Sequence, residues 1–238
     1  MFKKTRRQRV LYVGKTWFCL LILALFCLFF SCTQDEYEKG EGKYSQMRAD
    51  FVEAHASANK TADYVVTDDG DSLALETPLS VNWMTTPDSI YRSLLYYQIA
   101  QGKNGGKVAQ VISLGRVSSS RLRHPSFFKQ GVKTDPVHFE SLWVSKNRRY
   151  LNVGMALMVG AVDGDAIHRI GMVGDTIVTH ANGKSTYRLR FYHDQGGVPE
   201  NYSQRIYFSL PLRGLDVDSM SLSINTYSGL VKRTLPVR

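Results

Sequence analysis

The sequence YRLRFY at Tyr187–Tyr192 decides the fold class, because large apolar side chains alternate in it with arginine and tyrosine. A period of two puts alternate side chains on opposite faces of an extended chain, as in a β-strand that buries one face. The same period recurs at Leu151–Val159 and at Arg205–Leu212, with turn residues between the segments. Strands at this spacing predict a β-sandwich in the second half of the chain.

Shorter segments with the same period fill the first half of the chain. They are Met47–Phe51, Ser80–Trp83, Ser89–Ile99 and Val108–Leu114, together with two apolar runs around the turn Thr67–Asp71. An Asp-Gly pair between apolar runs is a strong hairpin signal, because a type I′ turn needs positive φ at both central residues. Calcium binding by its aspartates is the alternative, but the complete twelve-position loop is absent. A small barrel is predicted here.

The N-terminus combines a basic leader, the apolar run Trp17–Phe30 and Cys32. The run has 14 residues, whereas a membrane-spanning helix needs about 20. These features are typical of a signal peptide, and Ser31-Cys32 resembles the end of a bacterial lipobox, whose cysteine takes a diacylglycerol. We expect residues 1–31 to be a cleaved lipoprotein signal peptide and Cys32 to carry lipid, including an N-acyl chain such as palmitate. An uncleaved anchor, with Cys32 a bystander, is the alternative.

The net charge of +9 is concentrated in the leader, which holds six of the 30 basic residues and none of the 21 acidic ones. The remaining 24 basic and 21 acidic residues are ordinary for a soluble domain, so no nucleic-acid partner is expected. All three cysteines also lie within the first 32 residues, which excludes disulfides and cysteine-ligated zinc in the mature chain. The six histidines show no zinc-binding spacing, so no metal or cofactor is expected.

The acidic segment Thr33–Gly42 has little to bury and is predicted to be a tether. Its start, Gln34-Asp35-Glu36, resembles export tags that direct lipoproteins to the outer membrane, and a plain solvated linker is the alternative. The lipid anchor would then hold the protein on the periplasmic or the cell-surface side. The expected organisation is a signal peptide at 1–31, a lipidated cysteine and tether at 32–43, a barrel at 44–117, a linker at 118–135 and a sandwich at 136–238.

Several motifs resemble the NigD-like lipoproteins of Gram-negative envelopes. They are Asn82-Trp83, Thr85–Arg92, Pro136–Trp143, Tyr150–Asn152, Tyr187–Asp194 and Pro199–Ser203. The resemblance implies an N-terminal OB-type barrel and a C-terminal β-sandwich. It also implies a suggested role in bacteriocin immunity, because the family name comes from an association with bacteriocin gene clusters. No catalytic residues are established for the family, so none is carried over.

One candidate ligand surface follows from the strand pattern. If the strands at Tyr187 and Ile206 form a hairpin pair, their outward side chains share one face of a sheet. These are Arg188, Arg190, Tyr192, Arg205 and Tyr207. Guanidinium groups beside aromatic rings suit anionic or carbohydrate ligands. A solvated sheet face is the alternative, and we favour it on the sequence alone. The loop Asp194–Tyr202 is long for a hairpin, which suggests a binding loop or a structural corner, and the corner is slightly preferred.

Four triplets of Asp, then Ser or Thr, then an apolar residue resemble acceptors for O-glycosylation in some Gram-negative bacteria. The acceptor residues would be Ser72, Ser89, Thr176 and Ser219. The alternative is turn chemistry at strand entries.

The sequence therefore favours a non-enzymatic, outer-membrane-anchored lipoprotein that contacts membrane lipid through Cys32 and binds an envelope protein or glycan. Bacteriocin or toxin immunity is the first alternative. A glycan hydrolase that uses carboxylates such as Glu140 or Glu200 is the second, and it requires two carboxyl groups about 5 to 9.5 Å apart. No catalytic motif is found.

Overall fold

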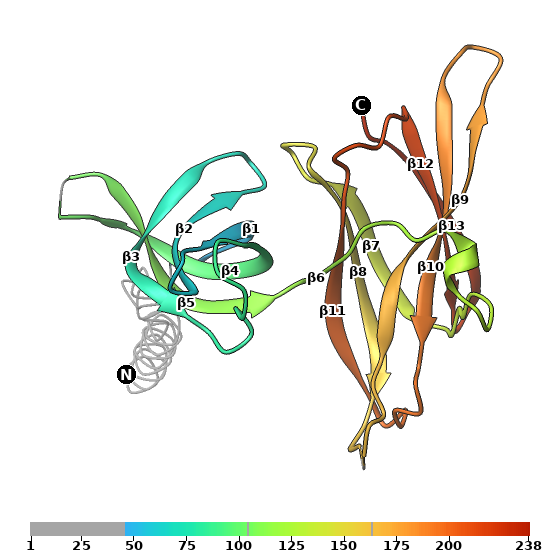
Figure 1. Ribbon diagram of the computed structural model, residues 1–238, viewed down its shortest axis with the longest axis horizontal. Coiled ribbons are helices and arrows are strands. Elements are labelled where there is room, and N and C mark those ends of the chain that lie inside the picture. The colour runs from blue at the N-terminus through green and yellow to red at the C-terminus, as the bar shows by residue number, and fades with distance from the viewer. Residues whose placement is uncertain (1–45, 104, 163) are drawn as a thin grey trace, which may run out of the picture. The chain divides into compact units, whose positions relative to one another are not determined.

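The computed structural model describes residues 46–103, 105–162 and 164–238, and strands dominate it (Figure 1). The predicted signal peptide, Cys32 and the tether lie outside the described residues. Within them, no helix combines the length and apolar character needed to cross a membrane. The described part is all-β, with a small barrel followed by a two-sheet sandwich, so the predicted fold class is confirmed.

The first five strands close into a barrel in the order β1-β2-β3-β5-β4. Their bounds are β1 Arg48–Ala56, β2 Thr61–Thr67, β3 Ser72–Ser80, β4 Ile90–Gln101 and β5 Lys107–Arg116. β1 pairs with both β2 and β4, and a short parallel pairing of β3 with β5 completes the closure. Alternate side chains such as Val52, Ala54 and Leu95 fill the barrel interior.

The predicted hairpin at Thr67–Asp71 is confirmed, since β2 and β3 pair antiparallel on either side of it. Gly70 adopts a φ of +96° there, which glycine reaches without a steric penalty. The Asp68 carboxylate binds Arg92, and no group of three or more acidic, histidine or cysteine residues among the described ones could hold a metal ion. The structure therefore supports the bare turn at this position.

The predicted strand at Ser80–Trp83 is wrong. β3 ends at Ser80, and a turn follows in which the Met84 N–H donates to the Val81 carbonyl at 3.1 Å. Met84 is buried in the barrel core, and Trp83 packs against that core beside Tyr91. Val81 and Trp83, the apolar residues that suggested a strand, instead pack against the barrel core.

Two four-stranded sheets form the sandwich, in the orders β13-β12-β10-β9 and β6-β11-β8-β7 (Figure 1). The bounds are β6 Ser118–Ser119, β7 His138–Val144, β8 Tyr150–Val159, β9 Arg169–Thr179, β10 Ser185–Asp194, β11 Tyr202–Pro211, β12 Ser219–Thr226 and β13 Gly229–Pro236, with a 3-10 turn, η1, at Pro125–Phe127. Inward side chains of both sheets, among them Val153, Phe191, Phe208 and Leu222, form one core. The apolar residues of the alternating pattern that predicted the sandwich thus form its buried face.

The predicted hairpin pair of the Tyr187 and Ile206 strands is wrong. β10 pairs with β9 and β12, whereas β11 pairs with β8 and β6, so the two strands lie in opposite sheets. The loop between them crosses from one sheet to the other. Because both strands bury one face in the same core, their outward faces belong to different sides of the sandwich.

The connecting loop is a structural corner, as the sequence slightly favoured. The Asp194 carboxylate accepts from the Gly196 N–H at 3.0 Å and pairs with Lys133 at 2.9 Å. The hydrogen bond from Lys133 is the main reason why the pKa of Asp194 lies below its usual value. Gly196 has a φ of +61° and approaches the Ile167 carbonyl so closely that no side chain fits. The loop is therefore held by the contacts of Asp194 and by the close backbone approach at Gly196.

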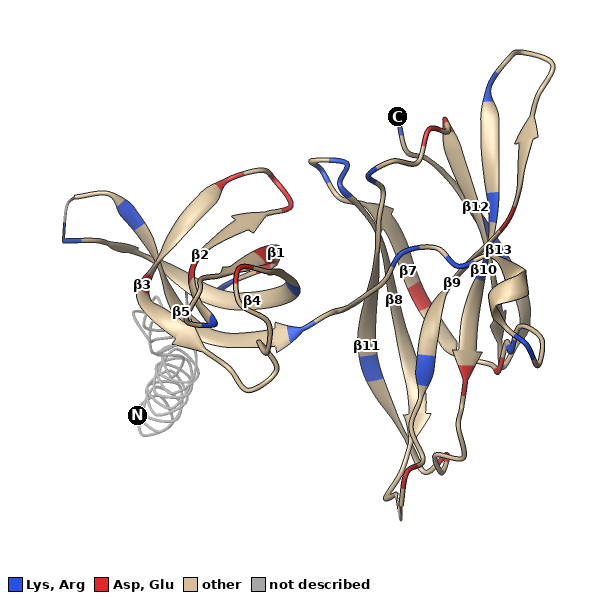
Figure 2. Cartoon of the chain, in the orientation of Figure 1, with Lys and Arg blue, Asp and Glu red and all other residues tan. Residues whose placement is uncertain are grey.

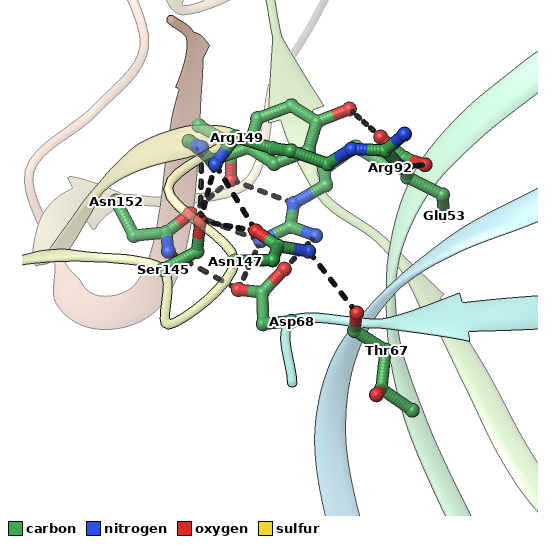
Figure 3. A network of polar contacts seen from close by, with 10 residues as sticks. Glu53, Thr67, Asp68, Arg92, Ser145, Asn147, Arg149 and Asn152 are labelled. Atoms are coloured by element: carbon green, nitrogen blue, oxygen red, sulfur yellow. Dashed lines mark hydrogen bonds and ion pairs between the residues drawn. The ribbon is translucent and has the colours of Figure 1, made fainter. Parts of the chain in front are cut away.

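A buried cation joins the barrel to the sandwich (Figure 3). Arg92 on β4 donates two hydrogen bonds, of 2.7 and 2.6 Å, to the Asp68 carboxylate of the barrel. The same guanidinium donates to Ser209 on β11 and to Asn152 on β8, each at 3.1 Å. Its Cζ atom lies over the Tyr150 ring, 4.0 Å from the ring centroid. With Arg92 only 5% exposed, every one of these partners compensates for the lost hydration of its charge.

A stacked pair of histidines lies at the start of β9 and the end of β10. His193 is fully buried, and its Nδ1 donates to the Asp135 carbonyl at 3.0 Å. In the neutral ring Nε2 is then an acceptor, and His168 Nδ1 lies 3.0 Å from it. His168 Nε2 is buried. Burial, and then the neighbouring His193, lower the pKa of His168 below 6.5, and a hydrogen bond with the Met158 backbone, which raises this pKa, offsets part of the effect of burial.

We expect Asp68→Ala to lower the free energy of unfolding by about 3–5 kcal/mol, because it leaves Arg92 buried without its counter-ion. Chemical denaturation measures the change. The matched control is Asp69→Ala, which removes the exposed pair with Lys146 and should cost less than about 1 kcal/mol. Equal effects of the two substitutions would contradict the role assigned to Arg92.

The histidine pair predicts acid sensitivity. Below pH 6.5 the unfolded chain takes up a proton at His168 while the folded chain resists it, so the free energy of unfolding falls as the pH falls. His168→Gln should flatten this dependence between about pH 6.5 and 5. Denaturation at several pH values measures it, with His180→Gln at an exposed position as control. A variant at His168 that kept the full acid sensitivity would refute the assignment.

Candidate functional site

Small side chains along β12 create a groove on the outer face of the sheet β13-β12-β10-β9. Alternation places Met220, Leu222 and Ile224 in the core and points Ser221, Ser223 and Asn225 outward. The longer outward side chains of β10 and β13 flank this row. Ser223 pairs with Arg190 of β10 on one side and with Lys232 of β13 on the other. The result is a groove of about 680 Å³, lined by Thr134, Asp175, Thr176, Arg188, Leu189, Arg190, Ser221, Ser223, Asn225, Leu230 and Lys232.

Two of the charges in this groove neutralise each other. Arg190 donates from Nε and Nη2 to the Asp175 carboxylate, at 2.8 and 2.6 Å. This bidentate pair raises the pKa of Arg190 above its ordinary value. A β-bulge at Asp175, between the pairings of Arg188 and Leu189, brings the carboxylate to the guanidinium. Arg190 is therefore held in place and contributes little net charge.

The other two cations of the groove are free to bind a ligand. In the described part of the chain, the side chains of Arg188 and Lys232 make no ion pair or hydrogen bond. Ser221 accepts from Thr234 at 2.9 Å, and Asn225 donates to the Thr134 carbonyl at 2.8 Å, so part of the polar floor is fixed. A guanidinium, an ammonium and nearby hydroxyl groups suit a carboxylate on a polar ligand.

The five residues of the predicted surface do not form one site. Arg188 and Arg190 line the groove, whereas Tyr192 on the same sheet packs against Phe128 with ring centroids 4.5 Å apart. Arg205 and Tyr207 lie on the opposite sheet. Arg205 Nε donates to Glu140 at 2.7 Å, and the Tyr207 ring packs against Phe51 of the barrel at 5.0 Å. The prediction of one shared surface is wrong because it assumed a hairpin.

Lys232 and the serines of β12 line the groove although no sequence motif marks them as site residues. Their place in the groove depends on the parallel pairing of β10 with β12, which joins strands about 30 residues apart in the chain. The alternation of Ser221 and Ser223 with apolar residues is visible in the sequence. It indicates an outward face but does not say which strand lies beside it.

The carboxylates proposed for hydrolysis each have a separate partner. Glu140 binds Arg205, and Glu200 accepts from the Tyr227 hydroxyl at 3.1 Å. Neither residue lines the groove of β12. The arrangement of these two side chains gives no support to a glycosidase mechanism.

The four candidate glycosylation residues differ in exposure. Ser72 and Thr176 are exposed, and Thr176 lies in the groove. The Ser89 hydroxyl donates to the Pro87 carbonyl at 3.0 Å, and the Ser219 hydroxyl lies 2.7 Å from Thr186 Oγ1. Two of the preceding aspartates have structural roles, since Asp175 binds Arg190 and Asp218 accepts from the Ser185 N–H. Glycosylation at these positions stays a prediction.

Comparisons with known proteins agree with this architecture. Residues 122–236 match the family model of the NigD-like C-terminal beta sandwich domain. No curated protein matches the chain.

Among solved structures, a NigD-like immunity protein from Bacteroides caccae is 22% identical, with a TM-score of 0.59 over 78% of this chain and 91% of that one. A protein of unknown function from Bacteroides vulgatus is 13% identical, with a TM-score of 0.59 over 80% and 90% of the two chains. A Bacteroides fragilis protein, provisionally described as a lipoprotein, is 12% identical, with a TM-score of 0.55 over 81% and 99%.

These TM-scores establish a common fold. Residues 122–236 carry the C-terminal sandwich domain of the NigD-like family, and this match to the family model confirms the resemblance found in the sequence.

Proposed function

We propose that this chain is a non-enzymatic binding protein of the bacterial outer membrane, anchored by lipid on Cys32, which holds an acidic glycan of the envelope in the groove of β12. The observation that carries this proposal is the pair of unpartnered cations, Arg188 and Lys232, in a groove whose other charges are neutralised. A carboxylated sugar supplies both the missing negative charge and hydroxyl groups for the polar floor.

Several features support the anchored, non-catalytic part of the proposal. The leader, the short apolar run and Cys32 have the order of a lipoprotein signal. A protein of similar fold is provisionally described as a lipoprotein. Glu140 and Glu200, the carboxylates considered for hydrolysis, are engaged elsewhere. On this proposal the protein acts by retention of a partner on the periplasmic or cell-surface side.

The double substitution Arg188→Ala with Lys232→Ala should weaken binding of a uronic-acid polymer such as polygalacturonate by at least about tenfold, because each charged hydrogen bond contributes roughly that much. Isothermal titration calorimetry measures the affinity. The matched control, Arg121→Ala with Lys184→Ala, removes the same charge outside the groove and should bind normally. The carboxyl-reduced polymer should bind neither wild type nor variant. Unchanged affinity in the groove variant would rule out this site.

Toxin or bacteriocin immunity is a second candidate. A structurally similar protein is named a NigD-like immunity protein. Leu230, at 73% exposure, borders the groove and gives it an apolar contact for a protein partner. Immunity predicts that deletion of the gene sensitises cells to a bacteriocin of neighbouring strains, and that the wild-type gene but not a Leu230→Asp, Lys232→Glu version restores resistance. Deletion cells with unaltered resistance across a strain panel would eliminate it.

A further inference from the structure

A second groove, of about 650 Å³, carries a concentration of arginine. Its lining includes Arg116 at the end of β5, Arg148 and Arg149 in the turn between β7 and β8, and Arg213 after β11. Glu53 is the acidic residue that lines it. Figure 2 shows the basic residues of the turn between β7 and β8 in blue. The groove shares no lining residue with the groove of β12, so it is an independent site.

The carboxylate of Glu53 is already neutralised. It accepts from Arg149 Nη1 at 2.5 Å and from the Tyr150 hydroxyl at 2.8 Å. Burial, and then the bond to Glu53, raise the pKa of Tyr150, so its hydroxyl remains a donor. Arg92, which also lines the groove, is compensated by Asp68. These five side chains, Asp68 included, therefore carry no net charge to attract or repel a ligand.

The remaining three guanidinium groups have no such compensation. In the described part of the chain, the side chains of Arg116, Arg148 and Arg213 form no ion pair, hydrogen bond or ring contact. Like charges gathered around one concave surface repel each other, and an anion bound among them removes that repulsion. The groove thus offers about three positive charges within the volume of a small-ligand site.

The turn that carries Arg148 is held rigidly. Arg148 has a φ of +57°, an uncommon conformation for a residue other than glycine. The Ser145 hydroxyl accepts from the N–H groups of Arg149 and Tyr150, at 3.0 and 2.9 Å. Asn147 joins the turn to the barrel, because its N–H donates to the Asp68 carbonyl and its side chain to the Thr67 carbonyl (Figure 3). The backbone of the site is therefore ordered before a ligand arrives.

We propose that this groove binds a ligand with two or more phosphate groups, held by Arg116, Arg148 and Arg213. Guanidinium groups bind phosphate oxygens in bidentate geometry, and a polyphosphorylated group is compact enough to meet three of them in this volume. Such phosphates come either from a lipid headgroup or from a soluble polyphosphate, and both share the chemistry that the groove recognises.

The test compares the full chain with the triple variant Arg116→Ala, Arg148→Ala, Arg213→Ala. Inorganic tripolyphosphate is titrated by calorimetry, and cosedimentation is measured with vesicles of cardiolipin, whose headgroup carries two phosphates, and of phosphatidylcholine. The difference between the vesicles removes the contribution of the lipid anchor, which is the same for both. The matched control is Arg121→Ala, Lys129→Ala, Lys184→Ala, which loses the same charge at positions that line neither groove. Thermal unfolding should be unchanged in the triple variant, because the three side chains make no contact that its truncation removes.

Tripolyphosphate, or cardiolipin vesicles in preference to phosphatidylcholine vesicles, should bind the wild type and the control. The triple variant should lose affinity by at least about a hundredfold, since each charged hydrogen bond contributes roughly tenfold. Binding of the soluble ligand alone would identify a soluble source, and binding of the vesicles alone a membrane source. No binding of either, or equal binding by the triple variant, would overturn the proposal. Neither outcome affects the acidic-glycan site, which uses other residues.

Discussion

The buried Arg92 guanidinium is the interaction on which the rest of this structure depends. It sits on a barrel strand, yet two of its hydrogen-bond partners, Asn152 and Ser209, belong to the sandwich. A charge removed from water must be paired and hydrogen-bonded on all sides, and here no single layer of the fold supplies enough partners. Barrel and sandwich must therefore meet for Arg92 to be satisfied, which is consistent with Met47–Arg238 forming one compact unit.

The two grooves follow a common pattern, in which neutralised residues position cations that have no partner. In the groove of β12, the pair of Arg190 with Asp175 lies beside the free Arg188. In the arginine groove, Glu53 is occupied by Arg149 and Tyr150, next to the free Arg148. The paired residues fix geometry, while the unpaired ones supply attraction for a ligand. On this division of roles, a chain with 24 basic and 21 acidic residues after its leader would offer the two proposed anion-binding surfaces.

The strands and the hairpin turn could be predicted from the sequence, because they depend on the local residue pattern. Alternation in Tyr187–Tyr192 identified a half-buried strand, and the turn at Gly70 identified a hairpin. The sequence did not predict contacts between residues that are far apart in the chain. Arg92 occupies an ordinary polar position in its strand, and nothing nearby in the sequence indicates its partners 60 and 117 residues away. The hairpin assumed for β10 and β11 failed for the same reason, because a period of two identifies a face but not a neighbour.

The most direct test of the central claim is hydrogen exchange, followed by mass spectrometry, with and without an acidic oligosaccharide such as a galacturonate oligomer. The claim is that the groove of β12 retains an acidic glycan. It predicts slower exchange in peptides that contain Arg188 on β10 and Lys232 on β13, with no change around Arg116 and Arg213. Protection confined to other segments, or exchange that the oligosaccharide leaves unaltered throughout, would contradict it.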